Sequence, residues 1–435
     1  MRSTRSKRAP RTTIIPATSS SQLRNPKRLT IDLNGEALSY DYVFLRDSCQ
    51  CRHCVNPVSR EKLFQTSDIS PDVRPLFIMT LPNGALRITW DPQSDVPWHN
   101  PLKGTNHTSL YTTEFLRRYS QGRHIVRGRF DDRPQVLWDK VLMEDQVLWM
   151  DYGGYLESDE KLFEALNQLC AYGLFFLRGV PAEESSVEKV AERIGAIKDT
   201  LYGRTWDIKS HTDPKNVPYT SLDLGLHMDL LYFESPPGVQ FLHCLKNTAQ
   251  GGSSIFADAF RAATTVRMSS HMLWHSLLRY PVPFRYEYDG HHYHHAHPTV
   301  VLDRTDYRTN KRISHVNYSP PSQAPFEGDG QSLDDLQYAG KFKQFHTALR
   351  MFANGINEPK AQFELTLAEG DCAVFVNRRV LHGRRRFDSR GGGERWLKGA
   401  YVDTDAFLSK WRVLSGKFKG TKFSRPESYE YVRTA

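Results

Sequence analysis

The sequence lacks any run of 18 apolar residues, and it contains only six cysteines among its 435 residues. A membrane-spanning helix needs about 20 consecutive apolar residues, so no such span is expected. Three of the cysteines, Cys49, Cys51 and Cys54, fall within six residues, and the other three are scattered. Secreted domains held by disulfides do not show this distribution. It indicates a reducing compartment and one local metal site.

Acidic residues are absent from residues 1–31, where eight lysines and arginines lie. These account for eight of the nine excess positive charges, so the rest of the chain is nearly neutral. A nearly neutral body has little attraction for phosphate backbones, and no nucleic-acid partner is expected. The Arg- and Ser-rich leader, residues 1–28, is typical of a mitochondrial transit peptide, but Pro10 and Pro16 would interrupt an amphipathic helix. A basic tail on a cytoplasmic protein therefore stays open as the alternative to a mitochondrial location.

The length of the chain predicts two domains. In residues 29–128, apolar residues alternate at 29–33 and 86–90, and Asn83-Gly84 is a hairpin signal between two apolar runs. A helix is expected at 112–119. These patterns predict a small, β-rich N-terminal domain.

The second domain is expected at residues 139–435, with helices first and strands after residue 220. Ser158 and Ser186 can each cap a helix, and residues 174–177 read as a buried strand. Alternation at 239–245 and 363–367 predicts further strands, and the apolar run 372–376 predicts another. Helices followed by many strands in one large domain predict an α+β fold containing a decorated jelly roll.

Two side chains of ligand type, His227 and Asp229, are separated by one residue, so they share one face of an extended strand. Two histidines and one carboxylate form a facial triad that suits Fe(II), because three coordination positions stay open. The third ligand would be His382, although it could instead be a surface histidine beside the basic run 384–386. A second triplet, His211-Thr212-Asp213, lies in a hydrophilic stretch. We favour His227 and Asp229 because they precede the apolar run 230–233, which reads as a core strand.

Several stretches then occur in an order that resembles the gamma-butyrobetaine dioxygenase family, which includes the trimethyllysine dioxygenases. The resemblance covers residues 29–414 and is far more specific than any single motif. The stretches are Tyr202-Gly203-Arg204-Thr205-Trp206, Asn216-Val217-Pro218-Tyr219, His227-Met228-Asp229, Pro236-Pro237-Gly238-Val239-Gln240, His243-Cys244, Gly251-Gly252, Leu381-His382-Gly383-Arg384-Arg385 and Gly399-Ala400-Tyr401.

The resemblance implies a double-stranded β-helix that uses Fe(II) and 2-oxoglutarate, with ascorbate as a possible reductant. It strengthens His382 as an iron ligand and Arg395 as the partner of the distal 2-oxoglutarate carboxylate, which a planar guanidinium binds well. It also implies an aromatic cage for a trimethylammonium group, which cannot donate a hydrogen bond and is recognised by ring faces. The cage residues are Tyr202, Trp206, Tyr219 and Tyr401, with Asn216 and the weaker match Asn317 expected near the substrate carboxylate.

The family also has a small N-terminal zinc domain. Cys49, Cys51 and Cys54 would supply three thiolates, and His53, His99 and His107 are candidates for the fourth ligand. The pattern of the family matches His107 best. A Cys₃His site is closed and structural, because four protein ligands exclude water. The histidine-rich stretch 291–297 is interpreted as a loop and strand edge without metal.

The implied reaction is hydroxylation of gamma-butyrobetaine to L-carnitine, while 2-oxoglutarate is cleaved to succinate and carbon dioxide. Hydroxylation of trimethyllysine or another betaine is the alternative within the same class. A zinc-stabilised betaine-binding protein without activity is the alternative from another class. We expect a small-molecule substrate, no membrane partner and a homodimer.

Overall fold

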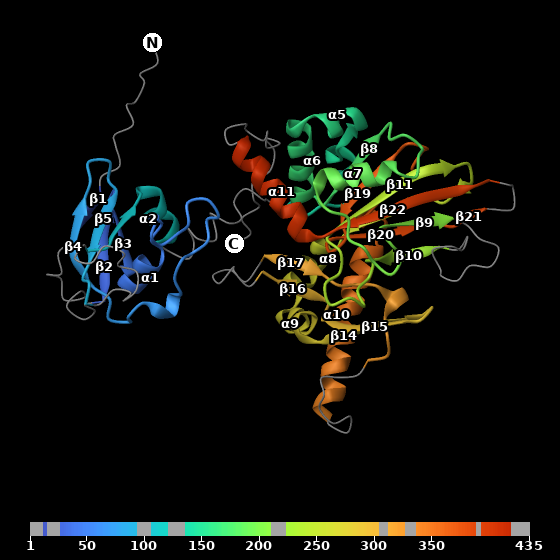
Figure 1. Cartoon of the computed structure of the whole chain (residues 1–435). Helices are drawn as coiled ribbons and strands as arrows, with labels where there is room; N and C mark the ends of the chain where they lie inside the picture. The colour runs from blue at the N-terminus through green and yellow to red at the C-terminus, as the bar shows by residue number, and fades with distance from the viewer. Residues whose placement is uncertain are drawn as a thin grey trace, which may run out of the picture. The chain divides into compact units, whose positions relative to one another are not determined.

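The chain folds into two compact units in the computed structural model: one formed by Met1–Asp132 with Thr305–Arg308, the other by Arg133–Arg304 with Thr309–Ala435 (Figure 1). The structure describes residues 12–14, 27–93, 106–120, 135–209, 223–303, 312–326, 336–388 and 393–418. None of the helices in these segments combines the length and the apolar character needed to cross a bilayer.

The first unit contains two antiparallel three-stranded sheets, ordered β1-β2-β3 and β4-β5-β6. Alternate residues of β2 and β5 are buried in one core, as the period-2 pattern predicted. The hairpin at Asn83-Gly84 is confirmed, with Gly84 at φ 81° between β4 and β5. The elements are β1 (Thr12–Ile14), β2 (Arg28–Leu33), β3 (Glu36–Asp41), α1 (Tyr42–Asp47), η1 (Thr66–Asp68), β4 (Pro75–Thr80), β5 (Leu86–Trp90), β6 (Thr108–Tyr111) and α2 (Thr113–Tyr119).

Two larger sheets form the centre of the second unit. The six-stranded sheet has the order β7-β8-β19-β11-β22-β9, and the four-stranded sheet has the order β10-β20-β13-β18. All their pairs are antiparallel except β7 with β8. The strands are β7 (Trp149–Asp151), β8 (Leu174–Arg178), β9 (Thr205–Lys209), β10 (Leu224–His227), β11 (Val239–Asn247), β13 (Ser254–Asp258), β18 (Gln362–Leu365), β19 (Cys372–Val376), β20 (Val380–Arg384) and β22 (Arg395–Val402).

The two sheets pack face to face, because side chains from both share one apolar cluster. Phe256 and Phe363 of the four-stranded sheet lie in this cluster with Leu242 and Phe375 of the six-stranded sheet. Two packed antiparallel sheets are the arrangement that a jelly roll requires. The structure therefore agrees with the predicted jelly-roll core in an α+β fold.

Helices cover the outer face of the six-stranded sheet (Figure 1). They are α5 (Tyr152–Glu157), α6 (Asp159–Ala171), α7 (Ser186–Ile194) and α11 (Thr404–Lys417). Ser158 caps α6 as predicted, since its hydroxyl accepts a hydrogen bond from the Lys161 amide. The prediction that Ser186 caps α7 was wrong: Ser186 is the first helical residue, and Ser185 precedes it without a side-chain cap. Two adjacent serines offer equivalent caps, so the sequence alone could not separate them.

Among the remaining elements of the second unit, α8, α9, α10 and the strands β14 to β17 pack around another apolar cluster. The remaining elements are α4 (Lys140–Gln146), β12 (Gln250–Gly251), α8 (Ala259–Ser269), α9 (His271–Arg279), β14 (Pro281–Tyr288), β15 (His291–Pro298), β16 (Val300–Leu302), β17 (Ile313–Val316), η3 (Pro320–Ser322), α10 (Leu336–Asn357), η4 (Pro359–Ala361) and β21 (Phe387–Asp388). The histidine-rich stretch forms β15, which pairs with β14 along its whole length.

Candidate active site

Three residues predicted as ligands converge at the end of β10. His227 is the last residue of β10, and it lies directly opposite His382 on β20. Asp229 follows two residues later, with its Oδ1 3.3 Å from the Nε2 of His227 and 3.8 Å from the Nε2 of His382. The ligand-type atoms of the three side chains lie within 4.8 Å of one another, so they could hold one metal ion.

The prediction of a core strand after Asp229 was wrong. Leu230 has φ 59°, and the amide of Phe233 donates to the Leu230 carbonyl, so the chain turns instead of extending. Asn377 holds this turn, accepting from the Asp229 amide at 2.9 Å and donating to the Asp229 carbonyl at 3.0 Å. Residues 230–232 are buried, as core strands are, and apolar character alone does not distinguish a buried turn from a buried strand.

Hydrogen bonding and burial set the protonation of the three side chains. His227 Nδ1 lies 2.8 Å from the Gly225 carbonyl, so Nδ1 donates a hydrogen bond and Nε2 is the ring nitrogen left to face a metal. Burial lowers the pKa of His382 to about 3, so this imidazole is neutral. Burial alone would raise the pKa of Asp229, but His382 and His227 hold it below its usual range. Two imidazoles and one carboxylate are a donor set that fits Fe(II).

The second oxygen of Asp229 is held by residues from the six-stranded sheet. Gln240 Nε2 donates to Oδ2 at 2.7 Å, and the Tyr401 hydroxyl donates to the same oxygen at 2.6 Å. Gln240 and Tyr401 lie opposite each other on β11 and β22. Sequence reasoning missed the role of Gln240. Its one signal was a polar residue inside the apolar run of a buried strand.

A cavity of about 240 Å³ opens beside these residues, and five aromatic side chains belong to its described lining. The rings of Trp206 and Tyr401 stack with centroids 4.0 Å apart and an angle of 18°. The hydroxyl of Tyr202 lies 3.3 Å from that of Tyr232, whose ring is 5.2 Å from the ring of Tyr286. The structure thus brings Tyr202, Trp206 and Tyr401 together, and it adds Tyr232 and Tyr286, which the sequence did not single out.

Arg395 lines the same cavity and is only 5% exposed, so it is not a surface arginine. Its Nε is buried and has no hydrogen-bond partner within the described part of the chain. Burial lowers the pKa of Arg395, and that of the neighbouring Arg384, to about 10, so both stay charged at neutral pH. A buried guanidinium is costly unless an anion pairs with it. Arg395 therefore fits a carboxylate of 2-oxoglutarate.

Asn317 is not brought to the cavity. Its side chain is buried, its amide nitrogen donates to the Pro298 carbonyl at 2.7 Å, and its oxygen accepts from Arg378 at 2.6 Å. Both ends of the amide are thus used in linking neighbouring segments. Asn216 and Tyr219, like the alternative triplet at 211–213, lie outside the described residues.

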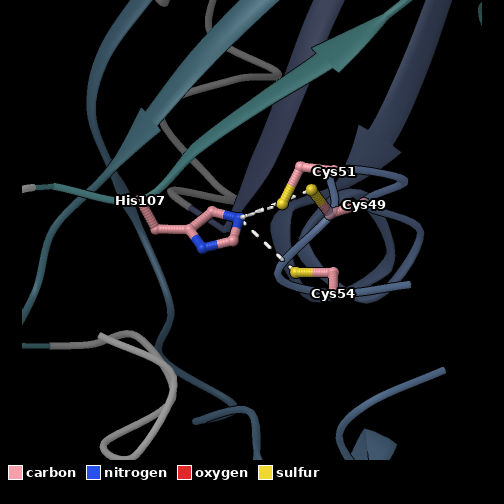
Figure 2. Close-up of side chains that lie close together, drawn as sticks. All are labelled: Cys49, Cys51, Cys54 and His107. Atoms are coloured by element: carbon pink, nitrogen blue, oxygen red, sulfur yellow. Dashed lines mark hydrogen bonds between the residues drawn. The ribbon is translucent and has the colours of Figure 1, made fainter. Parts of the chain in front are cut away.

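The cysteine cluster of the first unit converges on His107 (Figure 2). Its Nε2 lies 3.4 Å from the sulfur of Cys49, 3.8 Å from that of Cys51 and 3.6 Å from that of Cys54. Hydrogen bonds from Cys54 and His107 hold the pKa of Cys49 low, at about 3. Of the other two candidates, His53 is not part of this group, and His99 lies outside the described residues. Three sulfurs and one imidazole are a set that could bind zinc.

Comparison with known proteins agrees with this geometry. Residues 147–401 match the model of the taurine catabolism dioxygenase TauD, TfdA family, and residues 21–100 match the model of the gamma-butyrobetaine hydroxylase-like N-terminal region. The dioxygenase str8 of Strobilurus tenacellus is 38% identical over 91% of both chains.

Two further relatives carry the names of the expected family. A gamma-butyrobetaine dioxygenase of Pseudomonas sp. (strain AK-1) is 31% identical over 88% of this chain and 92% of its own. The mitochondrial trimethyllysine dioxygenase of Mus musculus is 28% identical over 89% of this chain and 85% of its own. The resemblance seen in the sequence is thereby confirmed. The chain belongs to the TauD, TfdA dioxygenases, in the group that contains the gamma-butyrobetaine and trimethyllysine dioxygenases, and it is an Fe(II)- and 2-oxoglutarate-dependent dioxygenase.

Proposed function

We propose that this dioxygenase hydroxylates a trimethylammonium carboxylate, with gamma-butyrobetaine as the substrate and L-carnitine as the product. The observation that carries the proposal is the group of five aromatic side chains in the lining of the cavity beside His227, Asp229 and His382. A trimethylammonium group spreads its charge over methyl groups and binds ring faces, at about 0.5–2 kcal/mol per contact. Tyr202, Trp206 and Tyr401 supply such faces.

In this proposal His227, Asp229 and His382 hold the iron, and Arg395 orients 2-oxoglutarate through its distal carboxylate. Iron and 2-oxoglutarate supply the oxidation, in which one atom of dioxygen enters a C–H bond and the other leaves in succinate. The chain's own contribution is placement: it holds one C–H bond of the substrate near the metal and keeps water away. Asn216 and Tyr219 remain proposed substrate contacts.

The proposal extends to the organisation of the chain. Residues 29–128 would form a domain held by one structural zinc at Cys49, Cys51, Cys54 and His107, and residues 139–435 would form the oxygenase domain. The basic leader, residues 1–28, would direct the protein to mitochondria, in keeping with the mitochondrial name of the mouse relative. Trimethyllysine or another betaine remains the alternative substrate.

Product analysis tests the proposal directly. The purified enzyme is supplied with Fe(II), 2-oxoglutarate and ascorbate, and then with each member of a panel of trimethylammonium compounds. We expect a product heavier by one oxygen from gamma-butyrobetaine, formed together with an equal amount of succinate. Turnover of 2-oxoglutarate without hydroxylation of any trimethylammonium compound would show that the substrate class is wrong. Absence of any 2-oxoglutarate turnover would contradict the roles proposed here for the three iron ligands and Arg395.

A further inference from the structure

In the cavity wall, positively charged side chains outnumber negatively charged ones. Among the described residues that line the cavity, Asp229 is the one carboxylate, whereas three arginines line it: Arg285, Arg384 and Arg395. Asp229 already faces both histidines and accepts hydrogen bonds from Gln240 and Tyr401. No acidic group of the described wall is therefore left to pair with a second cation on the substrate.

This imbalance persists with the metal and co-substrate bound. The two positive charges of a ferrous ion and the two negative charges of 2-oxoglutarate cancel, so the arginines still exceed the aspartate by two. Arg384 and Arg395 are buried beside each other at the end that fits 2-oxoglutarate. Arg285 is thus the cation of the wall left for an anionic group of a ligand, and no carboxylate among the described wall residues is left for an additional ammonium group.

Arg285 is placed to reach a ligand from the rim. It lies on β14, and its side chain is 50% exposed although it lines the cavity. Its ion pair with Glu287 spans 3.6 Å between two half-exposed side chains. Such pairs contribute little to stability, so the guanidinium can turn to a ligand without a large loss.

The segment beside Arg285 supplies hydroxyl groups on the same wall. Phe284 of β14 bridges to Gln323, and the Ala324 amide donates to the Pro283 carbonyl at 2.9 Å, so η3 lies against β14. Ser319 and Ser322, at the two ends of this segment, both line the cavity. A guanidinium together with hydroxyl donors is a favourable environment for a carboxylate.

We propose that Arg285 binds the carboxylate of the substrate, and that the cavity selects a trimethylammonium carboxylate lacking a second ammonium group. This inference rests on the proposed function and separates its two substrate candidates. Gamma-butyrobetaine carries one carboxylate and no other ionised group besides its trimethylammonium. Trimethyllysine carries an additional ammonium, for which the described wall offers no acid.

The test compares three trimethylammonium compounds: gamma-butyrobetaine, its methyl ester and trimethyllysine. For the wild-type enzyme we expect a kcat/KM for gamma-butyrobetaine at least about tenfold above that for either of the others. In Arg285→Gln, the preference for the acid over the ester should shrink at least about tenfold, through a raised KM for the acid. Arg350→Gln is the matched control, because Arg350 is an exposed arginine of α10 that does not line the cavity.

The other possible results would contradict either the role of Arg285 or the proposed substrate class. If the wild-type enzyme hydroxylates the ester as well as the acid, or prefers trimethyllysine, the role of Arg285 is wrong while the trimethylammonium substrate class stands. If Arg285→Gln keeps the wild-type preference, as Arg350→Gln should, the anchor lies elsewhere. If no trimethylammonium compound is hydroxylated, the proposed function fails and the assignment of Arg285 fails with it.

Discussion

Asp229 divides its two carboxylate oxygens between different partners. Oδ1 faces His227 and His382, while Oδ2 accepts hydrogen bonds from Gln240 and Tyr401. Two donors on one oxygen fix the rotation of the carboxylate, so that only the other oxygen is presented to a metal. In this way the six-stranded sheet positions a side chain that itself belongs to a turn.

Tyr401→Phe removes one of these hydrogen bonds while keeping the ring that stacks on Trp206. Because partners of metal ligands affect affinity strongly, we expect the affinity for Mn(II), used in place of Fe(II), to fall about 10- to 100-fold. Isothermal titration calorimetry measures it. Tyr293→Phe is the control, since Tyr293 lies on β15 and packs on Phe233. Equal affinities for wild type and Tyr401→Phe would show that Gln240 alone orients the carboxylate.

Trp206→Leu removes the indole face from the cavity. We expect the KM for gamma-butyrobetaine to rise at least about tenfold, which is about 1.4 kcal/mol, because a quaternary ammonium loses an aromatic contact. Steady-state kinetics with product detection measure it, and Trp149→Leu, outside the cavity wall, is the control. An unchanged KM in Trp206→Leu would mean that this ring serves only to support Tyr401.

For single residues, the sequence predicted which side chains belong to the candidate iron site better than it predicted the contacts that position them. The spacing of His227 and Asp229 identified two side chains that the structure does bring together with His382. It could not reveal Gln240 or Asn377, because their contacts with Asp229 depend on how the turn at Leu230 and the six-stranded sheet are placed by the tertiary fold. Asn317 was expected near the substrate as a weak match to the family pattern, but both ends of its amide form hydrogen bonds elsewhere.

Among the elements, a buried ion pair joins segments that surround the four-stranded sheet. Arg379 pairs with Asp258 at 3.2 Å, and both side chains are 3% exposed or less. Arg379 also donates to the carbonyls of Ala171 and Val136, while Asp258 caps α8. One guanidinium thus connects the end of α6, the segment before α4 and the start of α8.

Arg379→Met leaves the Asp258 carboxylate buried without its cation. Because an uncompensated buried charge is costly, we expect the free energy of unfolding to fall by about 3–5 kcal/mol. Urea unfolding followed by circular dichroism measures it. Lys161→Met is the control, because the Lys161–Glu164 pair is exposed and should contribute less than about 1 kcal/mol. A similarly small loss in Arg379→Met would contradict the assigned role of this ion pair.

The sequence predicted the end of an element correctly where one local residue determines it. The prediction failed where contacts between distant segments determine it. The hydroxyl of Ser158 caps α6 through a local bond that can be read from the sequence. The turn at Leu230 depends on Asn377, which is 147 residues away in sequence, so the apolar run after Asp229 was read as a strand. The strand β11 is buried on both faces, because helices cover one face and the four-stranded sheet covers the other.

For the whole molecule, buried histidines should make stability depend on pH. His243 is fully buried and His297 is 8% exposed, and burial lowers the pKa of each to about 4. The unfolded chain binds a proton on each histidine near pH 6.5, whereas the folded chain does so only near pH 4. Stability is therefore complete above about pH 6.5 and falls as the pH decreases towards 4, by at most about 1.4 kcal/mol per pH unit for each histidine.

The pH dependence is measured by urea unfolding between pH 7.5 and 4. We expect His243→Gln to show a smaller fall in stability over this range than the wild type, because one of the protons taken up on unfolding is lost. His346→Gln, which removes an exposed histidine of α10, should keep the wild-type slope. Parallel slopes for wild type and His243→Gln would show that His243 does not contribute.

A metal ion held by the cysteine cluster would link metal binding to the folding of the first unit. Tetrahedral zinc with bonds of about 2.3 Å to sulfur and 2.05 Å to nitrogen requires sulfur–nitrogen separations of roughly 3.6 Å. The separations of 3.4–3.8 Å around His107 Nε2 match this requirement. Cys49 and Cys54 also belong to the apolar core that joins the two small sheets, so a metal here would crosslink the core itself.

We therefore expect about one zinc per chain in protein purified without chelators, measured by elemental analysis. In Cys51→Ser the zinc content should fall sharply, because one thiolate ligand is lost, and proteolysis between residues 27 and 120 should accelerate, because metal binding stabilises the fold. Cys170→Ser, in α6 of the second unit, should keep both the zinc and the wild-type cleavage rate. Wild-type protein without zinc, or a Cys51→Ser variant that retains it, would mean that the four side chains pack as a reduced core cluster and not as a metal site.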